Sequence, residues 1–158
     1  MNSSEEFKVG KHSIGFVNSS FIERFEEQDF EAVTTPPRAI RLPQYMNNAQ
    51  IESELKPGLC TLGDVLAVLD STDLTYRDGN WNLFYFPSCV VSVCWDSWGG
   101  SWGVSAWHRD GGVWNEGDRV FSPASDRLEH SVPSGLSLES LDARLKKIER
   151  IINPELLK

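Results

Sequence analysis

The sequence lacks four short motifs that mark common cofactor and metal sites. It contains no GxGxxG, no GxxxxGK followed by Ser or Thr, no HExxH and no CxxC. In the first two motifs, glycines let backbone N–H groups approach a phosphate; in the others, the spacing places metal or redox ligands side by side. The glycine pairs at 99–100 and 111–112 are predicted to form turns. We therefore predict no cofactor and no metal site, and we assign no catalytic residue.

Basic residues, long apolar runs and paired cysteines are also scarce. The chain has 15 Lys and Arg against 23 Asp and Glu, a net charge of −8, and no basic cluster in its body to bind a nucleic-acid backbone. The longest apolar run, CVVSVCW, is too short to span a bilayer, and no signal peptide is evident at the N-terminus. Cys60, Cys89 and Cys94 are odd in number, which favours reduced thiols. We therefore predict a cytoplasmic protein that binds neither membranes nor nucleic acid directly.

The composition is that of an ordinary globular protein, with 40% hydrophobic and 24% charged residues. A chain of 158 residues is predicted to form one domain, residues 1–158. Within it we distinguish a mixed N-terminal segment, 1–58, then a helix followed by a β-meander, 59–122, and a C-terminal helix, 137–152.

Short runs rich in β-branched and aromatic residues dominate the middle of the chain, separated by turn sequences. They are LTYR, NWNLFYF, CVVSVCWD, WGVSAWHR, GVWN and RVFS. This spacing predicts an α+β fold with an antiparallel five- or six-stranded meander at about residues 74–122 and helices on one face. The proline-punctuated TTPPRAIRLPQY is predicted to be an edge segment or a loop.

Strand pairing decides which way the tryptophans point. Asp-Gly pairs at 78–79 and 110–111 predict two-residue hairpins that set Tyr76 opposite Trp81 and Trp107 opposite Trp114. Between them, pairing Asp96 with Ser101 collects apolar side chains on one face, whereas a one-residue slip would mix the faces. That first face contains Phe84, Phe86, Cys89, Val91, Val93, Trp95, Trp102, Val104 and Ala106. The second face carries Tyr76, Trp81, Tyr85, Trp107 and Trp114 around Ser92, Gly103 and Ser105.

Helices are predicted from caps and periodicity. Ser20 with Glu23 forms a capping-box pattern ahead of a helix that buries Phe21, Ile22 and Phe25, and Thr61 caps a core-facing helix at 62–70. NNAQIESEL is predicted to be a short helix that ends at Pro57-Gly58. In the tail, an aliphatic seam either packs on the sheet or forms a homodimer. Its residues are Leu138, Leu141, Leu145, Ile148 and Ile152.

Two surfaces are candidates for binding. The aromatic set is Tyr76, Trp81, Trp98, Trp107 and Trp114. If residues 1–58 cover this face, we expect its aromatic rings to form a second core. Otherwise we expect a partner surface or a groove for a small ligand. The acidic set is Glu23, Glu26, Glu27, Asp29 and Glu31. It serves either solubility or a basic partner protein.

Catalysis has little support in the sequence. Cys94 and His108 resemble a thiol–imidazole pair, but the predicted register places His108 opposite Cys89, ~17 Å along the strand from Cys94. The same geometry excludes a zinc site from these three side chains. An enzyme would need a cleft that joins at least two of His108, Arg109, Asp110 and Glu116. The leading hypothesis is a non-enzymatic protein-interaction module, such as a regulator or inhibitor; a small-ligand binder and an enzyme of another type are the alternatives.

Overall fold

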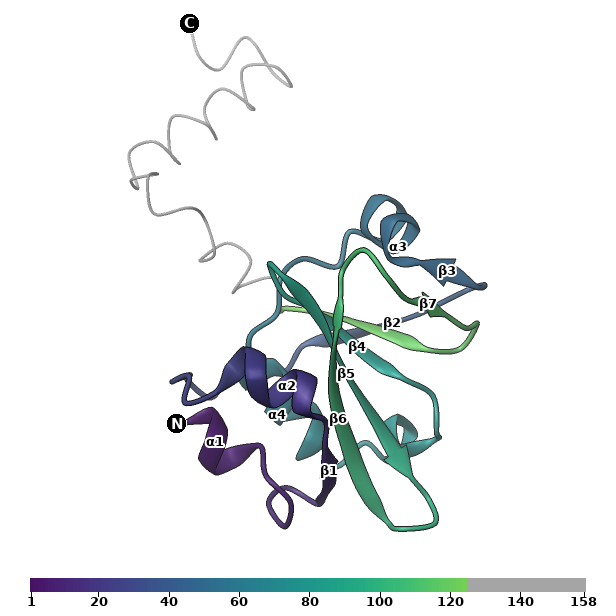
Figure 1. Ribbon diagram of the computed structural model, residues 1–158. Coiled ribbons are helices and arrows are strands. Elements are labelled where there is room, and N and C mark those ends of the chain that lie inside the picture. Colours follow the sequence, from purple (N-terminus) through teal and green to yellow (C-terminus); the bar gives the residue numbers. More distant parts are fainter. Residues whose placement is uncertain (125–158) are drawn as a thin grey trace, which may run out of the picture. The chain divides into compact units, whose positions relative to one another are not determined.

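A computed structural model, which describes residues 1–124, has a six-stranded mixed sheet with helices on both of its faces (Figure 1). In spatial order the strands are β1 (Ile14–Val17), β6 (Ser101–His108), β5 (Cys89–Asp96), β4 (Asn82–Tyr85), β8 (Arg119–Ser122) and β2 (Arg38–Arg41). β1 is parallel to β6 and β4 is parallel to β8, whereas the other neighbours are antiparallel. The α+β class is confirmed, but the prediction of a purely antiparallel meander is wrong.

The meander breaks after β6. The next strand, β7 (Val113–Trp114), pairs with β3 (Met46–Asn47) in a separate two-stranded sheet. The chain then returns to place β8 between β4 and β2. All four residues of β8 are buried, which is typical of a central strand and does not suit the edge of a meander. β2 lies at the sheet edge, as its flanking prolines predict.

The long hairpin of β5 and β6 has the predicted register. Cys89 lies opposite His108 and Asp96 lies opposite Ser101, with all the pairs between them as expected. β4 continues the same alternation, since Phe84 belongs to the first face and Leu83 to the second. Burial of one apolar set per face explains why the sequence specifies this register.

Neither Asp-Gly pair forms the predicted two-residue hairpin. Such a turn needs positive φ at both central residues, yet φ at Asp78 is −93°. LTYR is the 3₁₀-helix η1 (Leu74–Arg77) rather than a strand, so Tyr76 does not lie opposite Trp81. At the second pair, the positive φ of 100° falls on Gly112, and β7 leaves β6 to join β3. Trp107 and Trp114 are therefore not cross-strand partners.

The first face of the sheet is covered by α2 (Ser19–Phe25) and α4 (Leu62–Leu69), with α1 (Ser3–Glu6) beside α2. Thr61 and Asp64 form a capping box at the start of α4, as expected for the predicted cap at Thr61. α2 begins earlier than predicted, because the Asn18 side chain accepts the Ser20 N–H and is the cap instead of Ser20. Phe21 and Phe25 are buried, but Ile22 is half exposed, contrary to expectation.

The second face is covered in part by α3 (Asn48–Glu54), so the prediction of helices on one face is wrong. The sequence predicts α3 correctly as a short helix, and a capping box of Asn47 and Gln50 begins it. The core under α3 contains Leu42, Met46, Ile51, Leu83, Tyr85, Val90, Trp114 and Val120. The N-terminal segment therefore forms a second core with part of the aromatic face.

Two sequence predictions fall on the end of the chain. The helix at 137–152 and the seam proposed for a homodimer lie outside the described residues. Among residues 1–124, no helix is long and apolar enough to cross a membrane.

Candidate functional site

Three of the aromatic candidates come together on the second face. The rings of Trp81, Trp107 and Trp114 contact one another edge to face, with centroid distances of 6.4, 6.4 and 6.2 Å. This geometry suits the quadrupoles of aromatic rings. The buried Asp118 carboxylate positions Trp81, because its Oδ1 accepts the Trp81 backbone N–H at 3.0 Å.

Asn48, at the start of α3, fixes Trp114 in place. Its Oδ1 accepts hydrogen bonds from Tyr85 Oη at 2.6 Å and from Trp114 Nε1 at 2.8 Å. Its Nδ2 donates to the carbonyl oxygens of Arg109, at 3.0 Å, and Gly111. The whole hydrogen-bonding capacity of the amide is used. Sequence reasoning missed this residue, because an Asn at a helix start is ordinary and its hydrogen-bond partners lie far along the chain.

The three tryptophans differ in how much surface they offer. Trp114 is 5% exposed, Trp81 is half-buried and Trp107 is 42% exposed. Trp107 Nε1 donates to Ser92 Oγ at 2.7 Å, which holds the indole against the small residues of the second face. Trp107 is thus the most exposed member of this cluster.

The remaining two aromatic candidates lie elsewhere. The Tyr76 ring packs against the first-face residue Phe121 at 5.1 Å, and the Arg119 guanidinium lies 5.6 Å from its centroid. Tyr76 therefore does not belong to the second face. Trp98 is 98% exposed in the turn between β5 and β6, where its backbone N–H donates to Asp96 Oδ1 at 2.9 Å.

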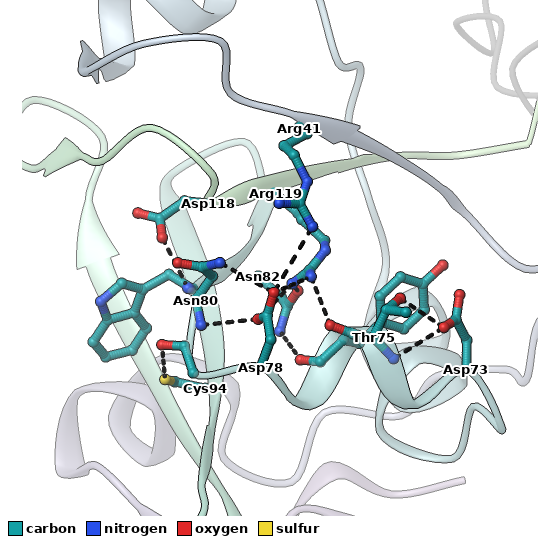
Figure 2. Close-up of polar contacts among 12 residues, drawn as sticks. Arg41, Asp73, Thr75, Asp78, Asn80, Asn82, Cys94, Asp118 and Arg119 are labelled. Atoms are coloured by element: carbon teal, nitrogen blue, oxygen red, sulfur yellow. Dashed lines mark hydrogen bonds and ion pairs between the residues drawn. The ribbon is translucent and has the colours of Figure 1, made fainter.

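A polar cluster surrounds Arg119 at the start of β8 (Figure 2). Arg119 is buried and donates to the Asp78 carboxylate, to Asn82 Oδ1 at 3.2 Å and to the Thr75 carbonyl oxygen at 2.6 Å. Burial opposes ionisation of Asp78, but hydrogen bonds from Arg119 and Asn80 outweigh it and lower the Asp78 pKa to about 2. The cluster joins η1 to the sheet and has a structural role.

The thiols of Cys89 and Cys94 lie at different points along β5, and burial raises the pKa of each. Cys94 pairs with Gly103 and Cys89 with His108, so the expected separation of Cys94 from His108 along the hairpin is present. Burial raises the pKa of Cys94, and the carboxylates of Asp118, Asp78 and Asp96 raise it further. Burial likewise raises the pKa of Cys89. Within residues 1–124, no cluster of three His, Cys, Asp or Glu side chains is suited to a metal ion.

One cleft brings three polar candidates together. His108, Arg109 and Asp110 line a cleft of about 660 Å³ between the start of α3 and the ends of β4 and β6, together with Ser88. Arg109 is fully engaged, since it forms an ion pair with Glu52 and donates to the carbonyl oxygens of Phe86 and Pro87. Glu116, the fourth sequence candidate, is not among the lining residues.

The side chains in this cleft are not linked as a catalytic relay. His108 Nδ1 lies 3.3 Å from the Arg24 guanidinium, which donates to it. Another serine, Ser101, lies in GGSWG, which matches the GxSxG spacing of a nucleophile elbow. Ser101 begins a strand of an antiparallel hairpin, however, whereas an elbow needs a strand that turns into a helix.

The acidic candidates lie on one exposed stretch. Glu23 is in α2, and Glu26, Glu27, Asp29 and Glu31 follow it; all five are exposed. A groove of about 250 Å³ lies beside them, between α1, α2 and β1. Its lining is Ser3, Ser4, Phe7, Lys8, Val9, Val17, Phe21, Ile22, Phe25 and Glu26. Val9 is 65% exposed and Ile22 is 50% exposed, so apolar surface is open to solvent here.

Sequence reasoning found the acids but missed the groove. Its walls come from three segments, and Phe7, Val9 and Val17 carry no pattern that links them to α2. The chain matches no family model, no curated protein and no solved structure.

Proposed function

We propose that the protein is a non-enzymatic protein-interaction module that contacts its partner through the α1–α2 groove and the adjoining acidic stretch at 23–31. The observation that carries this proposal is an apolar groove, open to solvent at Val9 and Ile22, with Glu26 on its rim. Exposed apolar surface with a polar rim is typical of protein interaction sites.

The other candidate surfaces support a binding role less well. The aromatic face is covered in part by α3 and β3, and the Trp114 indole N–H donates to Asn48. In the polar cleft, Arg109 is tied to Glu52 and two carbonyl oxygens. The groove is different, because its apolar side chains are partly uncovered.

A differential capture experiment tests the proposal. The immobilised protein would be compared with Ile22→Asp, Val9→Asp and, as a control outside the groove, Leu74→Asp in extract from its own cells, with quantitative mass spectrometry. Leu74 is also strongly exposed, so the control makes the same chemical change. We expect a defined protein to be retained by the wild type and Leu74→Asp but lost with both groove variants. Equal retention by all four proteins would refute the proposal.

A polar-ligand or enzymatic site in the cleft is a second candidate, favoured by the convergence of Ser88, His108 and Asp110. Its test is a screen of small polar compounds by NMR, with His108→Ala as the comparison. Saturable shifts at residues of the cleft that disappear in His108→Ala would support it. Shifts that persist in the variant, or none at all, would count against it.

A further inference from the structure

We infer that the groove receives the apolar face of a basic amphipathic helix supplied by the partner. This inference rests on the proposed function and adds the shape and charge of the partner. Three properties of the groove carry it: its size, the state of its polar groups and the sign of its surrounding charge.

Size favours the side chains of one helical face. The groove has about 250 Å³ of space and is open to solvent at Val9 and Ile22. A partner helix would lie across this opening and insert the apolar side chains of one face. Phe7, Phe21 and Phe25 form the buried floor, and Val9 and Ile22 are the uncovered walls. Helix-in-groove recognition uses such i, i+3, i+4 and i+7 anchors.

Several polar groups of α1 that line the groove are already bonded within the protein. Ser3 Oγ donates to the Phe25 carbonyl oxygen, and Ser4 Oγ accepts the Glu27 N–H at 2.9 Å. The Phe7 N–H donates to the Ser3 carbonyl oxygen at 2.8 Å. An extended peptide needs a row of free backbone groups to pair with, and the α1 groups named above are already bonded. A helix satisfies its own backbone internally, so it suits the groove better.

The charge around the groove selects a basic partner. Residues 1–35 carry seven acids and three bases. Glu23, Glu26 and Glu27 lie together at the end of α2, and all are exposed. Of the bases, Arg24 faces His108, and Lys8 lies on the lining of the groove. A partner helix with Lys or Arg beside its apolar stripe therefore gains attraction along the α2 rim.

Synthetic helical peptides of about 18 residues, ~27 Å long, provide the probe. The first carries Leu at i, i+3, i+4 and i+7 with Lys flanking the stripe. One control peptide replaces Lys by Glu, and a second keeps Lys but replaces Leu by Ala. Binding is measured by fluorescence anisotropy, and the contact site is mapped by backbone NMR shifts. We expect saturable binding of the Leu/Lys peptide, weaker binding of both controls, and shifts centred on α1 and α2.

Protein variants locate the binding. Ile22→Asp should weaken binding of the Leu/Lys peptide about tenfold, because it removes an apolar contact from the groove. A triple variant should also weaken peptide binding about tenfold at low salt and less at high salt; it combines Glu23→Gln, Glu26→Gln and Glu27→Gln. Leu74→Asp should leave the affinity for the peptide unchanged. Circular dichroism would check that each variant is folded.

The outcomes separate this inference from the proposed function. If the Leu/Lys and Ala/Lys peptides bind equally, or Ile22→Asp has no effect, the attraction is charge alone and the inference is wrong. If no peptide binds while capture of a cellular partner still depends on Ile22, the inference fails and the proposed function stands. If the wild type and Ile22→Asp capture the same cellular partner equally, the proposed function is wrong, and the inference that rests on it is wrong too.

Discussion

Arg119 and Asp78 form a two-point ion pair, in which the two terminal guanidinium nitrogens donate to the two carboxylate oxygens at 3.1 and 2.5 Å. Arg119 is buried in β8, and Asp78 directly follows η1, so the pair joins a local turn to an interior strand of the sheet (Figure 2). A planar guanidinium suits this geometry, and a lysine does not reproduce it.

Asp78→Asn should lower the free energy of unfolding by about 2 kcal/mol. The buried Arg119 charge loses its counter-ion, which costs several kcal/mol for a fully buried pair and less here because Asp78 is partly exposed. Urea denaturation would measure the change. In the double variant Asp78→Asn with Arg119→Met, no unpaired charge remains, so we expect stability closer to that of the wild type. A double variant less stable than the single one would contradict this explanation.

Stability should also depend on Asp78 in acid. Its pKa falls from 3.8 to about 2 on folding, so the unfolded chain takes up the proton first as pH decreases. The contribution of Asp78 is present above about pH 4 and is lost as pH falls towards 2. The wild-type protein should therefore lose its advantage over Asp78→Asn across this interval, as measured by urea denaturation at each pH. An advantage that stays constant down to pH 2 would exclude the pair as its source.

Asn48→Ala should destabilise the protein by about 3 kcal/mol, since it leaves Tyr85 Oη and Trp114 Nε1 buried without their acceptor. Tyr85→Phe is the matched control, because it removes one of these donors and leaves Asn48 bonded to Trp114. We expect a loss of about 1 kcal/mol for the control. Chemical denaturation measures both, and equal losses would show that the Trp114 hydrogen bond contributes little.

Trp98→Ala and Trp114→Ala should differ sharply although the chemical change is the same. Trp98 is almost fully exposed, so its removal should alter stability by less than about 0.5 kcal/mol. Trp114 is buried in the core under α3, and its removal should cost about 3–5 kcal/mol. Thermal and urea unfolding would compare the two. A large effect at Trp98 would mean that the β5–β6 turn packs against another surface.

The sequence predicts well what depends on neighbouring residues. The alternation of apolar and small side chains in β5 and β6 specifies their register, and Thr61 with Asp64 specifies the start of α4. The meeting of Trp81 and Trp107 on one face follows from that alternation. These features need no knowledge of distant segments.

Features that depend on distant partners were not predictable. Asp78 turns away from a hairpin and binds Arg119, 41 residues further along the chain. The parallel placement of β8 beside β4 follows from buried residues such as Val120 and Phe121, which a strand pattern alone does not assign to a neighbour. The groove was not predicted either, because Phe7 and Val17 meet α2 only in the folded protein.

The place of β8 between β4 and β2 has a consequence for folding order. β2 appears early in the chain, yet its neighbour in the sheet is the last described strand (Figure 1). During synthesis, β2 has no partner until Arg119–Ser122 has been made, whereas the β5–β6 hairpin closes between adjacent segments. Pairings between distant segments are slow to form. We therefore expect the β5–β6 hairpin to form early and the docking of β2 onto β8 to complete the sheet.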